Sequence, residues 1–227
     1  MWCRPSIGRE CCGRRRRRGY GRVVESSEQV NPDLFWALRG GGNFGIVTRF
    51  TYRLHPVGPM LYCGALVHPA ERAGEVLRFL REWSREVPDE VSLMVALVVA
   101  PPEPPFPPEL QGRPVAVLAA AYHGGLAESE RALRPLRELA QPAVDLLGPM
   151  PYVALQQMAD AGVPRGLHYY IKSEWLANLP DAVVNALVEH HLHRSSPIDQ
   201  ILVHQMGGAV ARVPRDATAF ALSLIHI

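Results

Sequence analysis

The sequence contains no apolar run of the roughly 18 residues that a membrane-spanning helix needs, and its first residues lack the apolar stretch of a secretory signal peptide. Its four cysteines have no paired CxxC spacing, so neither a zinc site nor a disulfide framework follows from them. The formal net charge is only +2 over 227 residues, so no global basic field favours nucleic acid. These absences favour a soluble protein without nucleic-acid or membrane partners, and the lack of a signal peptide favours a cytoplasmic location.

Residues 1–21 differ in composition from the rest of the chain. They contain five consecutive arginines, Arg14–Arg18, and almost no apolar periodicity. Arginine runs can bind phosphate backbones or act as import signals. A solvated, disordered arm explains the composition better, and a stretch of non-native sequence is a further alternative. We therefore interpret residues 1–21 as a disordered or non-native arm.

Residues 31–54, NPDLFWALRGGGNFGIVTRFTYRL, carry the clearest local signals of the chain. Asn31 suits the N-cap of a helix and Pro32 its first position. Gly40 ends this helix, because glycine adopts the left-handed conformation that a helix terminus needs. Beyond the glycines the apolar period changes to two, which predicts a strand over 46–54. The segment is therefore expected to form a helix, a glycine turn and a strand.

The turn Gly40–Gly45 matches the pattern G-x-G-x-x-G of dinucleotide-binding proteins. In a Rossmann unit this pattern follows a strand and opens a helix, so that the pyrophosphate meets a helix N-terminus. Here the glycines follow a helix and open a strand. A pyrophosphate would meet carbonyl groups at the negative end of the helix dipole. We therefore reject a Rossmann unit for this stretch.

The run LFWALRGGGNFGIVTRFTYRLHP resembles the end of the FAD-binding domain of the berberine bridge enzyme-like oxidases, within the vanillyl-alcohol oxidase superfamily. In that family the Gly-Asn-Phe-Gly-Ile-Val run lies against the cofactor through its backbone. Glycines let a backbone approach a large ligand, and their amides donate to phosphate or adenine acceptors. The resemblance implies FAD as the cofactor and gives eight candidate contacts: Gly40, Gly41, Gly42, Asn43, Phe44, Gly45, Ile46 and Val47.

Strands and amphipathic helices alternate in the remainder of the chain. Strands are expected over 60–67, 91–100, 115–122, 144–147, 167–176 and 199–206, with 209–213 continuing the last one after a bulge at two glycines. Helices are expected over 69–87, 127–139, 151–159 and 179–193. The proline-rich stretch 101–114 is interpreted as a stiff surface loop. This alternation alone suggests a parallel α/β sheet.

Two later stretches, GPMPYVALQQMADAGVPRGLHYYIKSEWL and HQMGGAVARVPRDATAF, are similar to the substrate domain of the same family. That domain is an antiparallel sheet with helices on one face and the flavin against the other. The resemblance covers residues 21–220 and replaces the parallel interpretation. It implies an α+β fold, in which residues 22–58 form the C-terminal piece of an FAD-binding domain and residues 59–227 form an incomplete substrate domain.

The expected strand 167–176 supplies two candidate substrate residues. Strand alternation places His168, Tyr170, Lys172 and Glu174 on one face, which is the more polar of the two. With helices on the other face of the sheet, this polar face would look toward the flavin. Tyr170 and Lys172 are therefore candidates for substrate contact, and a solvated sheet face is the alternative. Lys172 would stabilise a developing negative charge.

The stretch around MGGAVARVP supplies two more candidates. Arg212 lies where plant relatives with GG-x-x-x-E carry a glutamate thought to act as a base. Because arginine stays protonated, Arg212 cannot be a base; it is a candidate for binding an anionic or hydroxyl-rich substrate, with a surface salt bridge as the alternative. Gln205, just before the glycines, is a further candidate.

No metal site is expected, because the histidines at 190, 191 and 193 suit a helix C-terminus and lack partners at ligand spacing.

The resemblance is incomplete at both ends of the chain. The family's flavin-attachment histidine and cysteine motifs have no match here, and its C-terminal catalytic tyrosine is not reached before ALSLIHI. We therefore interpret the chain as a truncated part of an FAD-dependent oxidoreductase, with unknown catalytic residues, that is inactive by itself. The complete enzyme would pass a hydride from a small alcohol- or sugar-like substrate to flavin and then to dioxygen. The alternative is a non-catalytic α+β module that binds a small ligand or a partner.

Overall fold

The computed structural model describes residues 16–18, 22–40, 44–54 and 57–220, and these form two compact units. The first, here called the sheet unit, consists of residues 57–208. The second, the turn unit, consists of the described residues up to 54 together with 209–220. Residues 209–220 therefore group with the turn, whereas the sequence analysis assigns them to the substrate domain.

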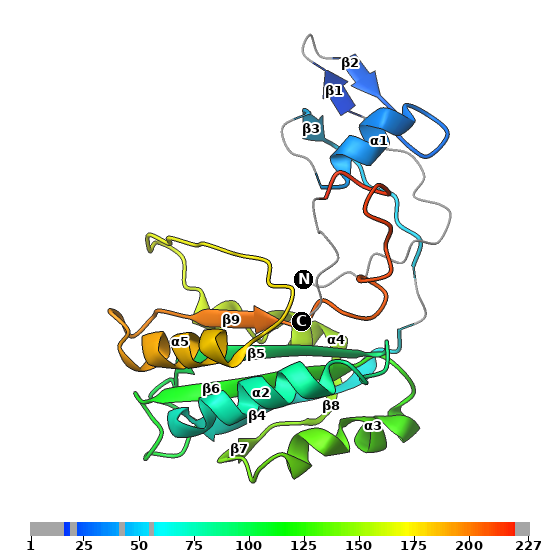
Figure 1. Cartoon of the computed structure of the whole chain (residues 1–227). Coiled ribbons are helices and arrows are strands. Elements are labelled where there is room, and N and C mark those ends of the chain that lie inside the picture. Colours follow the sequence, from blue (N-terminus) through cyan, green and yellow to red (C-terminus); the bar gives the residue numbers. More distant parts are fainter. Residues whose placement is uncertain (1–15, 19–21, 41–43, 55–56, 221–227) are drawn as a thin grey trace. The chain divides into compact units, whose positions relative to one another are not determined.

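The sheet unit is built on three long antiparallel strands (Figure 1). β4 (Met60–Pro69) and β5 (Val91–Val99) both pair with β6 (Pro114–Tyr122), which lies between them. β9 (Ile201–His204) pairs with the outer side of β5. Every pairing among the described strands is antiparallel, which confirms the antiparallel sheet and the α+β class that the family resemblance implies.

The outer edge of β4 is divided by a glycine. β7 (Val144–Asp145) pairs with one end of this edge and β8 (Gly148–Pro151) with the other. Between them, Gly64 has a φ angle of 140°. A Cβ atom on Gly64 would lie 2.1 Å from the carbonyl oxygen of Leu146. Glycine is needed here, because only a residue without a side chain allows this φ and this close approach together.

Three helices cover one face of the sheet: α2 (Ala73–Trp83), α3 (Leu126–Glu138) and α5 (Asp181–Leu192) (Figure 1). A short 3-10 turn, η1 (Ala70–Arg72), leads from β4 into α2. Alternate residues of the strands point into this layer and pack against the apolar sides of the helices. The buried core includes Leu66, Leu77, Leu80, Leu93, Val95, Leu97, Leu118, Leu133, Leu136 and Val184. Each such burial contributes about 1.5–3 kcal/mol, so this layer dominates the stability of the unit.

The other face of the sheet carries two smaller apolar clusters, one toward each end of the strands. At one end α4 (Tyr152–Gln157), followed by η2 (Asp160–Gly162), packs over Leu61 and Cys63. At the other end Leu110 of the proline-rich loop packs over the sheet. Alanines predominate on the rest of this face, with some larger side chains toward β9. We call this part the alanine face and define it by Ala65, Ala96, Ala119, Ala121, Ser92, Met94, Leu202 and His204.

The turn unit contains one short helix, α1 (Pro32–Leu38), whose buried side chains are Leu34 and Phe35. Pro32 starts the helix as predicted. Asn31 occupies the N-cap position with φ of 50°, but its side chain makes no capping bond. Its Nδ2 instead donates to the carbonyl oxygen of Glu25 at 2.7 Å. The predicted helix start is thus correct, while the asparagine stabilises the preceding loop.

Three short strands complete the turn unit: β1 (Arg16–Arg18), β2 (Arg22–Val24) and β3 (Ile46–Val47). They form a small antiparallel sheet in the order β2-β1-β3. The strand at Arg16–Arg18 differs from the disordered arm predicted for residues 1–21. Residues 1–15 and 19–21 lie outside the described residues.

Three predicted strands differ from the structure. β3 covers only the first two residues of the strand predicted over 46–54, and residues 167–176 and 209–213 form no strand. Alternation creates two faces, but a strand also needs a neighbour that satisfies its backbone hydrogen bonds. The described residues supply no such ladder at these places. No helix in the described ranges combines the length and apolar character needed to traverse a lipid bilayer.

Candidate functional site

The glycine turn after α1 connects a helix to a strand, as predicted. Gly40 and Gly45 have φ angles of 140° and 131°, which favour glycine. Residues 41–43, which include three of the candidate flavin contacts, lie outside the described residues. The side chains of Phe44 and Ile46 are 48% and 73% exposed. The described part of the turn therefore has exposed apolar side chains next to glycines, whose backbone no side chain covers.

Large apolar side chains continue beyond the turn. Those exposed in this segment are Phe44, Ile46, Phe50, Tyr52 and Leu54. The rings of Phe50 and Tyr52 stack with their centroids 5.6 Å apart. Exposed apolar side chains gathered in one segment mark a binding surface more often than chance exposure does. Aromatic rings and open glycine backbone suit a flat, partly aromatic ligand, so the residues present fit a flavin nucleotide.

Gly40 also has a neighbour within the chain. A Cβ atom on Gly40 would lie 2.1 Å from the backbone nitrogen of Phe220. The space beside this glycine is therefore occupied by the chain itself. Gly40 was predicted to end the helix and to contact the flavin, and the approach of Phe220 is a further reason for a glycine at this position.

Polar side chains border the alanine face at one end. Ser92 Oγ lies 3.3 Å from His123 Nε2. His204, the last residue of β9, pairs with Met94 across the strands. Burial lowers the pKa of His204, so its imidazole is neutral near pH 7 and offers one donor and one acceptor. Buried alanines and a few polar groups therefore lie together on this face of the sheet.

The sequence analysis missed Ser92, His123 and His204. The signal that could have found them is the strand register. Once Leu93 and Val95 are assigned to the helix-covered core, alternation places Ser92 and Met94 on the opposite face. His123 and His204 follow only after the neighbouring strands are paired with β5, and a single sequence does not show that pairing.

Tyr170 and Lys172 lie in a segment without regular secondary structure. Their side chains are exposed, and Lys172 Nζ lies 5.7 Å from the centre of the Tyr170 ring. The two side chains thus lie close together. The strand that was expected to give them a common face is absent, so their role in substrate contact stays a prediction.

Gln205 and Arg212 lie in different units. The backbone N–H of Gln205 donates to the carbonyl oxygen of Leu93 at 3.2 Å, which extends the β5–β9 ladder by one step. Residues opposite each other in a ladder share a face, so Gln205 lies on the side of Leu93, and His204 lies on the alanine face. Arg212 is exposed in the turns that follow Gly208. The predicted substrate roles of Gln205 and Arg212 remain predictions.

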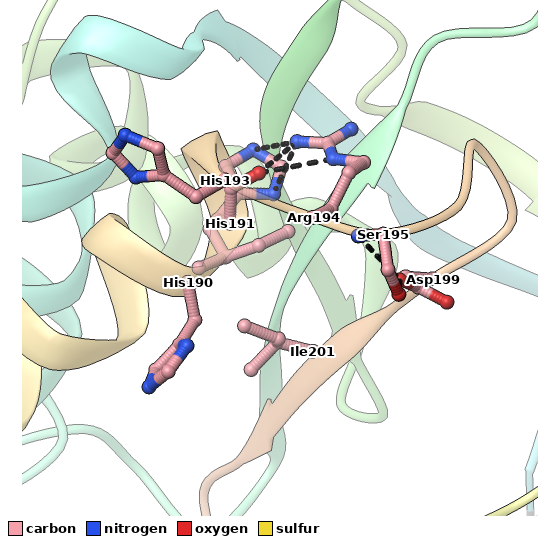
Figure 2. A pocket seen from close by; sticks show the side chains of 8 residues that line it. His190, His191, His193, Arg194, Ser195, Asp199 and Ile201 are labelled. Atoms are coloured by element: carbon pink, nitrogen blue, oxygen red, sulfur yellow. Dashed lines mark hydrogen bonds between the residues drawn. The ribbon is translucent and has the colours of Figure 1, made fainter.

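The end of α5 and the loop before β9 enclose a pocket of about 280 Å³ (Figure 2). Arg194 donates from Nε and Nη2 to the carbonyl oxygen of His191 and from Nη2 to His191 Nδ1, the last at 2.9 Å. Asp199 Oδ2 accepts from the N–H and Oγ–H of Ser195 and from the N–H of Ser196. These bonds satisfy the free groups of the helix end and the loop, which is a structural role.

The histidines at this pocket have no metal-binding arrangement. Burial first and the charge of Arg194 second lower the pKa of His191 to about 4, although a hydrogen bond with the Val115 backbone acts in the opposite direction. His191 is therefore neutral at pH 7. Among the residues that the structure describes, no group of three or more His, Cys, Asp or Glu is placed to hold a metal ion.

Comparison with known proteins gives relatives but no matching protein-family model. An FAD-linked oxidoreductase of Dictyostelium discoideum is 31% identical over 210 residues, which cover 88% of this chain and 42% of that protein. A xylooligosaccharide oxidase of Thermothelomyces thermophilus is 28% identical over 222 residues, with the same coverage of both chains. The solved structure of the BBE-like 1 protein of Physcomitrella patens superposes with a TM-score of 0.74 at 21% identity, covering 96% of this chain and 48% of that one.

The antiparallel sheet with helices on one face is the fold of the substrate-binding part of FAD-linked oxidoreductases. Over most of its length the chain is similar to an FAD-linked oxidoreductase, and its fold matches that of a BBE-like protein. It spans less than half the length of the relatives that it matches.

Proposed function

We propose that the chain supplies a flavin-contacting segment and the substrate-carrying sheet of an FAD-dependent oxidoreductase. The observation that carries the proposal is the extent of the similarity to an FAD-linked oxidoreductase. The alignment covers 88% of the chain and therefore includes residues of both units. When bound, FAD accepts a hydride from a substrate C–H bond, and dioxygen then takes up the two electrons and two protons as hydrogen peroxide.

The turn Gly40–Val47 is proposed to hold the cofactor through its backbone. Gly45 keeps the chain open, and Phe44 and Ile46 offer apolar contact beside it. Where no side chain blocks the approach of the ligand, backbone N–H groups can donate hydrogen bonds to phosphate or ring acceptors. The turn therefore contributes binding and orientation, while the cofactor supplies the redox chemistry.

The alanine face is proposed to accept a small alcohol- or sugar-like substrate. Relatives named xylooligosaccharide oxidase and glucooligosaccharide oxidase support a carbohydrate-like compound. Ser92 and His123 at the border of this face would bind its hydroxyl groups. Neutral His204 would accept the hydroxyl proton that leaves as the C–H bond breaks.

The four residues proposed from the sequence have narrower roles. Lys172 and Arg212 carry a fixed positive charge that would attract an anionic group or an electron-rich hydroxyl cluster. Tyr170 would stack on a sugar ring or donate its hydroxyl hydrogen. Gln205 would fix the position of its neighbour His204 through the ladder bond to Leu93. Arg212 is excluded as the base, because it does not lose its proton.

The proposal is tested with the complete reading frame, obtained by sequencing the DNA on both sides of this chain. The protein is expressed and purified, its visible spectrum is recorded after gel filtration, and peroxide formation is measured with a panel of sugars and alcohols. We expect a yellow protein that forms peroxide with at least one of them. A colourless protein that takes up no added FAD would overturn the proposal.

Two variants sharpen the experiment. Gly45→Val should lower flavin retention, because valine does not tolerate a φ of 131° and its side chain would occupy the approach to the backbone. Gly148→Ala, at a site with no neighbour within 4 Å, is the control for glycine replacement. The 227-residue chain alone should lose FAD on gel filtration, because a flavin site needs walls on several sides and the described residues offer one.

A further inference from the structure

A segment late in the chain is hydrogen bonded along α1, within the turn unit. Trp36 Nε1–H donates to the carbonyl oxygen of Asp216 at 2.6 Å. In return, the backbone N–H of Ala219 donates to the carbonyl oxygen of Trp36 at 3.2 Å. We call residues 216–220 the strap. The strap therefore holds both the side chain and the main chain of a residue in the last turn of the helix.

The same strap holds the residue that leads into the glycine turn. Arg39 Nη2–H donates to the carbonyl oxygen of Ala217 at 2.8 Å. The Arg39 guanidinium also lies 4.4 Å from the centre of the buried Phe35 ring, so its place is fixed from two sides. One residue later, Gly40 lies so close to Phe220 that a Cβ atom would reach the backbone nitrogen.

Helix α1 is too short to be stable by itself. It has only seven residues, and isolated helices of that length are not stable in water. Its described buried side chains are two, Leu34 and Phe35, at the third and fourth of its seven positions. The contacts with the strap are made at its C-terminal end, by Trp36 and Arg39. The position of this end determines where the chain enters the glycine turn.

We propose that the strap fixes the position of Gly40, where the chain enters the flavin-contact turn, with Trp36 and Arg39 as positioning residues. The inference rests on the proposed function. A binding backbone that is already ordered loses less conformational entropy when the ligand arrives. Releasing the strap should therefore weaken FAD binding more than it weakens folding, because the core clusters of the sheet unit contain none of these residues.

The first test replaces Gly40. Gly40→Ala cannot be accommodated unless the strap moves away, since the new Cβ would lie 2.1 Å from Phe220 N. Gly112→Ala is the matched control, because Gly112 also has a positive φ, of 69°, but no neighbour within 4 Å. In the flavin-binding protein we expect the FAD dissociation constant to rise about tenfold or more for Gly40→Ala and to stay unchanged for Gly112→Ala.

The second test removes single strap bonds. Arg39→Met and Trp36→Phe keep most of the apolar surface and delete one donor each. Arg72→Met is the control, since Arg72 is an exposed arginine of the sheet unit paired with Glu75 at 2.9 Å. Loss of a hydrogen bond from a charged group should raise the FAD dissociation constant about tenfold, with a smaller rise for tryptophan. Hydrogen exchange of the peptide 216–220 in the FAD-free protein should become faster in both variants.

The outcomes separate the two proposals. If the parent protein binds FAD and the variants release the strap yet bind FAD equally well, the positioning role is wrong and the proposed function stands. If the parent protein binds no FAD, the proposed function is wrong and the positioning role falls with it. Should Gly40→Ala not fold, Trp36→Phe and Arg39→Met decide the question. Equal loss of FAD affinity in the Arg72→Met control would also contradict the inference.

Discussion

At the end of α5, a hydrogen bond from Arg194 to the imidazole of His191 favours the neutral form of the histidine. His191 is 2% exposed, and its Nδ1 accepts a hydrogen from Arg194. A protonated imidazole could not accept this bond and would lie beside a second positive charge. The fold therefore selects the neutral histidine, and its pKa of about 4 follows from burial first and from Arg194 second.

We predict that the folded protein loses stability as the pH falls from about 6.5 to about 4. The pKa of His191 is lower in the folded state than its ordinary value of 6.5, so the unfolded state binds more protons in this window. The contribution is fully present above pH 6.5 and is lost as the pH falls toward 4. It amounts to about 3 kcal/mol. Urea unfolding at several pH values measures the slope.

The variant His191→Gln keeps a hydrogen-bond acceptor and cannot titrate, so its slope should be shallower. His190→Gln, at the exposed neighbouring position, is the control and should leave the slope unchanged. The buried His68, whose pKa is also lowered by burial, remains in both variants and keeps part of the slope. Equal slopes in the parent and in His191→Gln would contradict the prediction.

Single residues also show the limit of sequence reasoning. Four glycines in a short turn predict a close approach of the backbone, and the structure has one. The neighbour of Gly40 is Phe220, which is far away in the sequence. The residues around Gly40 do not predict this contact. A glycine pattern indicates that a neighbour comes close without saying whether that neighbour is a ligand or another part of the protein.

Among the elements, β4 depends most on one residue. We predict that Gly64→Ala destabilises the protein by at least about 2 kcal/mol, because the new side chain would require an unfavourable φ and would push the carbonyl of Leu146 away. Thermal or urea unfolding measures the loss. Gly148→Ala is the control, since Gly148 pairs with the residue before Gly64 and has open space at its Cβ position. A Gly64→Ala variant as stable as this control would contradict the account of the divided edge.

The elements were predictable where packing and pattern agree. The strands at 60–67, 91–100 and 115–122 and the helix at 179–193 are confirmed within a few residues. The strand predicted over 167–176 alternates equally well but is absent. Alternation reports that a segment could serve as a strand, while the presence of a hydrogen-bonding neighbour depends on the arrangement of the whole sheet.

For the whole molecule, the apolar clusters found among the described residues all lie in one unit. The three core clusters contain only residues of the sheet unit. We predict that residues 57–208 expressed alone fold cooperatively, because the burial that stabilises a domain is complete within them. Circular dichroism during urea unfolding, with tryptophan fluorescence as the second probe, measures this. Residues 22–56 are the control and should remain unfolded, since their short helix buries only two side chains. Non-coincident or gradual transitions for 57–208 would contradict the prediction.

The overall fold shows why alternation of strands and helices suggested a parallel sheet. β4, α2 and β5 do form a strand–helix–strand unit, and its two strands run in the same direction because both are antiparallel to β6. The next strand, β6, lies between them and makes every neighbouring pair antiparallel. A strand inserted in this way cannot be read from the order of elements. The family resemblance supplied the antiparallel sheet, and the pattern alone did not.

The borders of the large sheet are short. β9 presents four residues at one side, while β7 and β8 present two and four at the other, separated by the passage at Gly64. A second molecule aligned along either border would gain only a few main-chain hydrogen bonds before the pairing broke. Long, flat borders are the template on which sheets grow from one molecule to the next. This sheet can therefore remain rich in valine, leucine and alanine at high concentration with little tendency to extend into fibres.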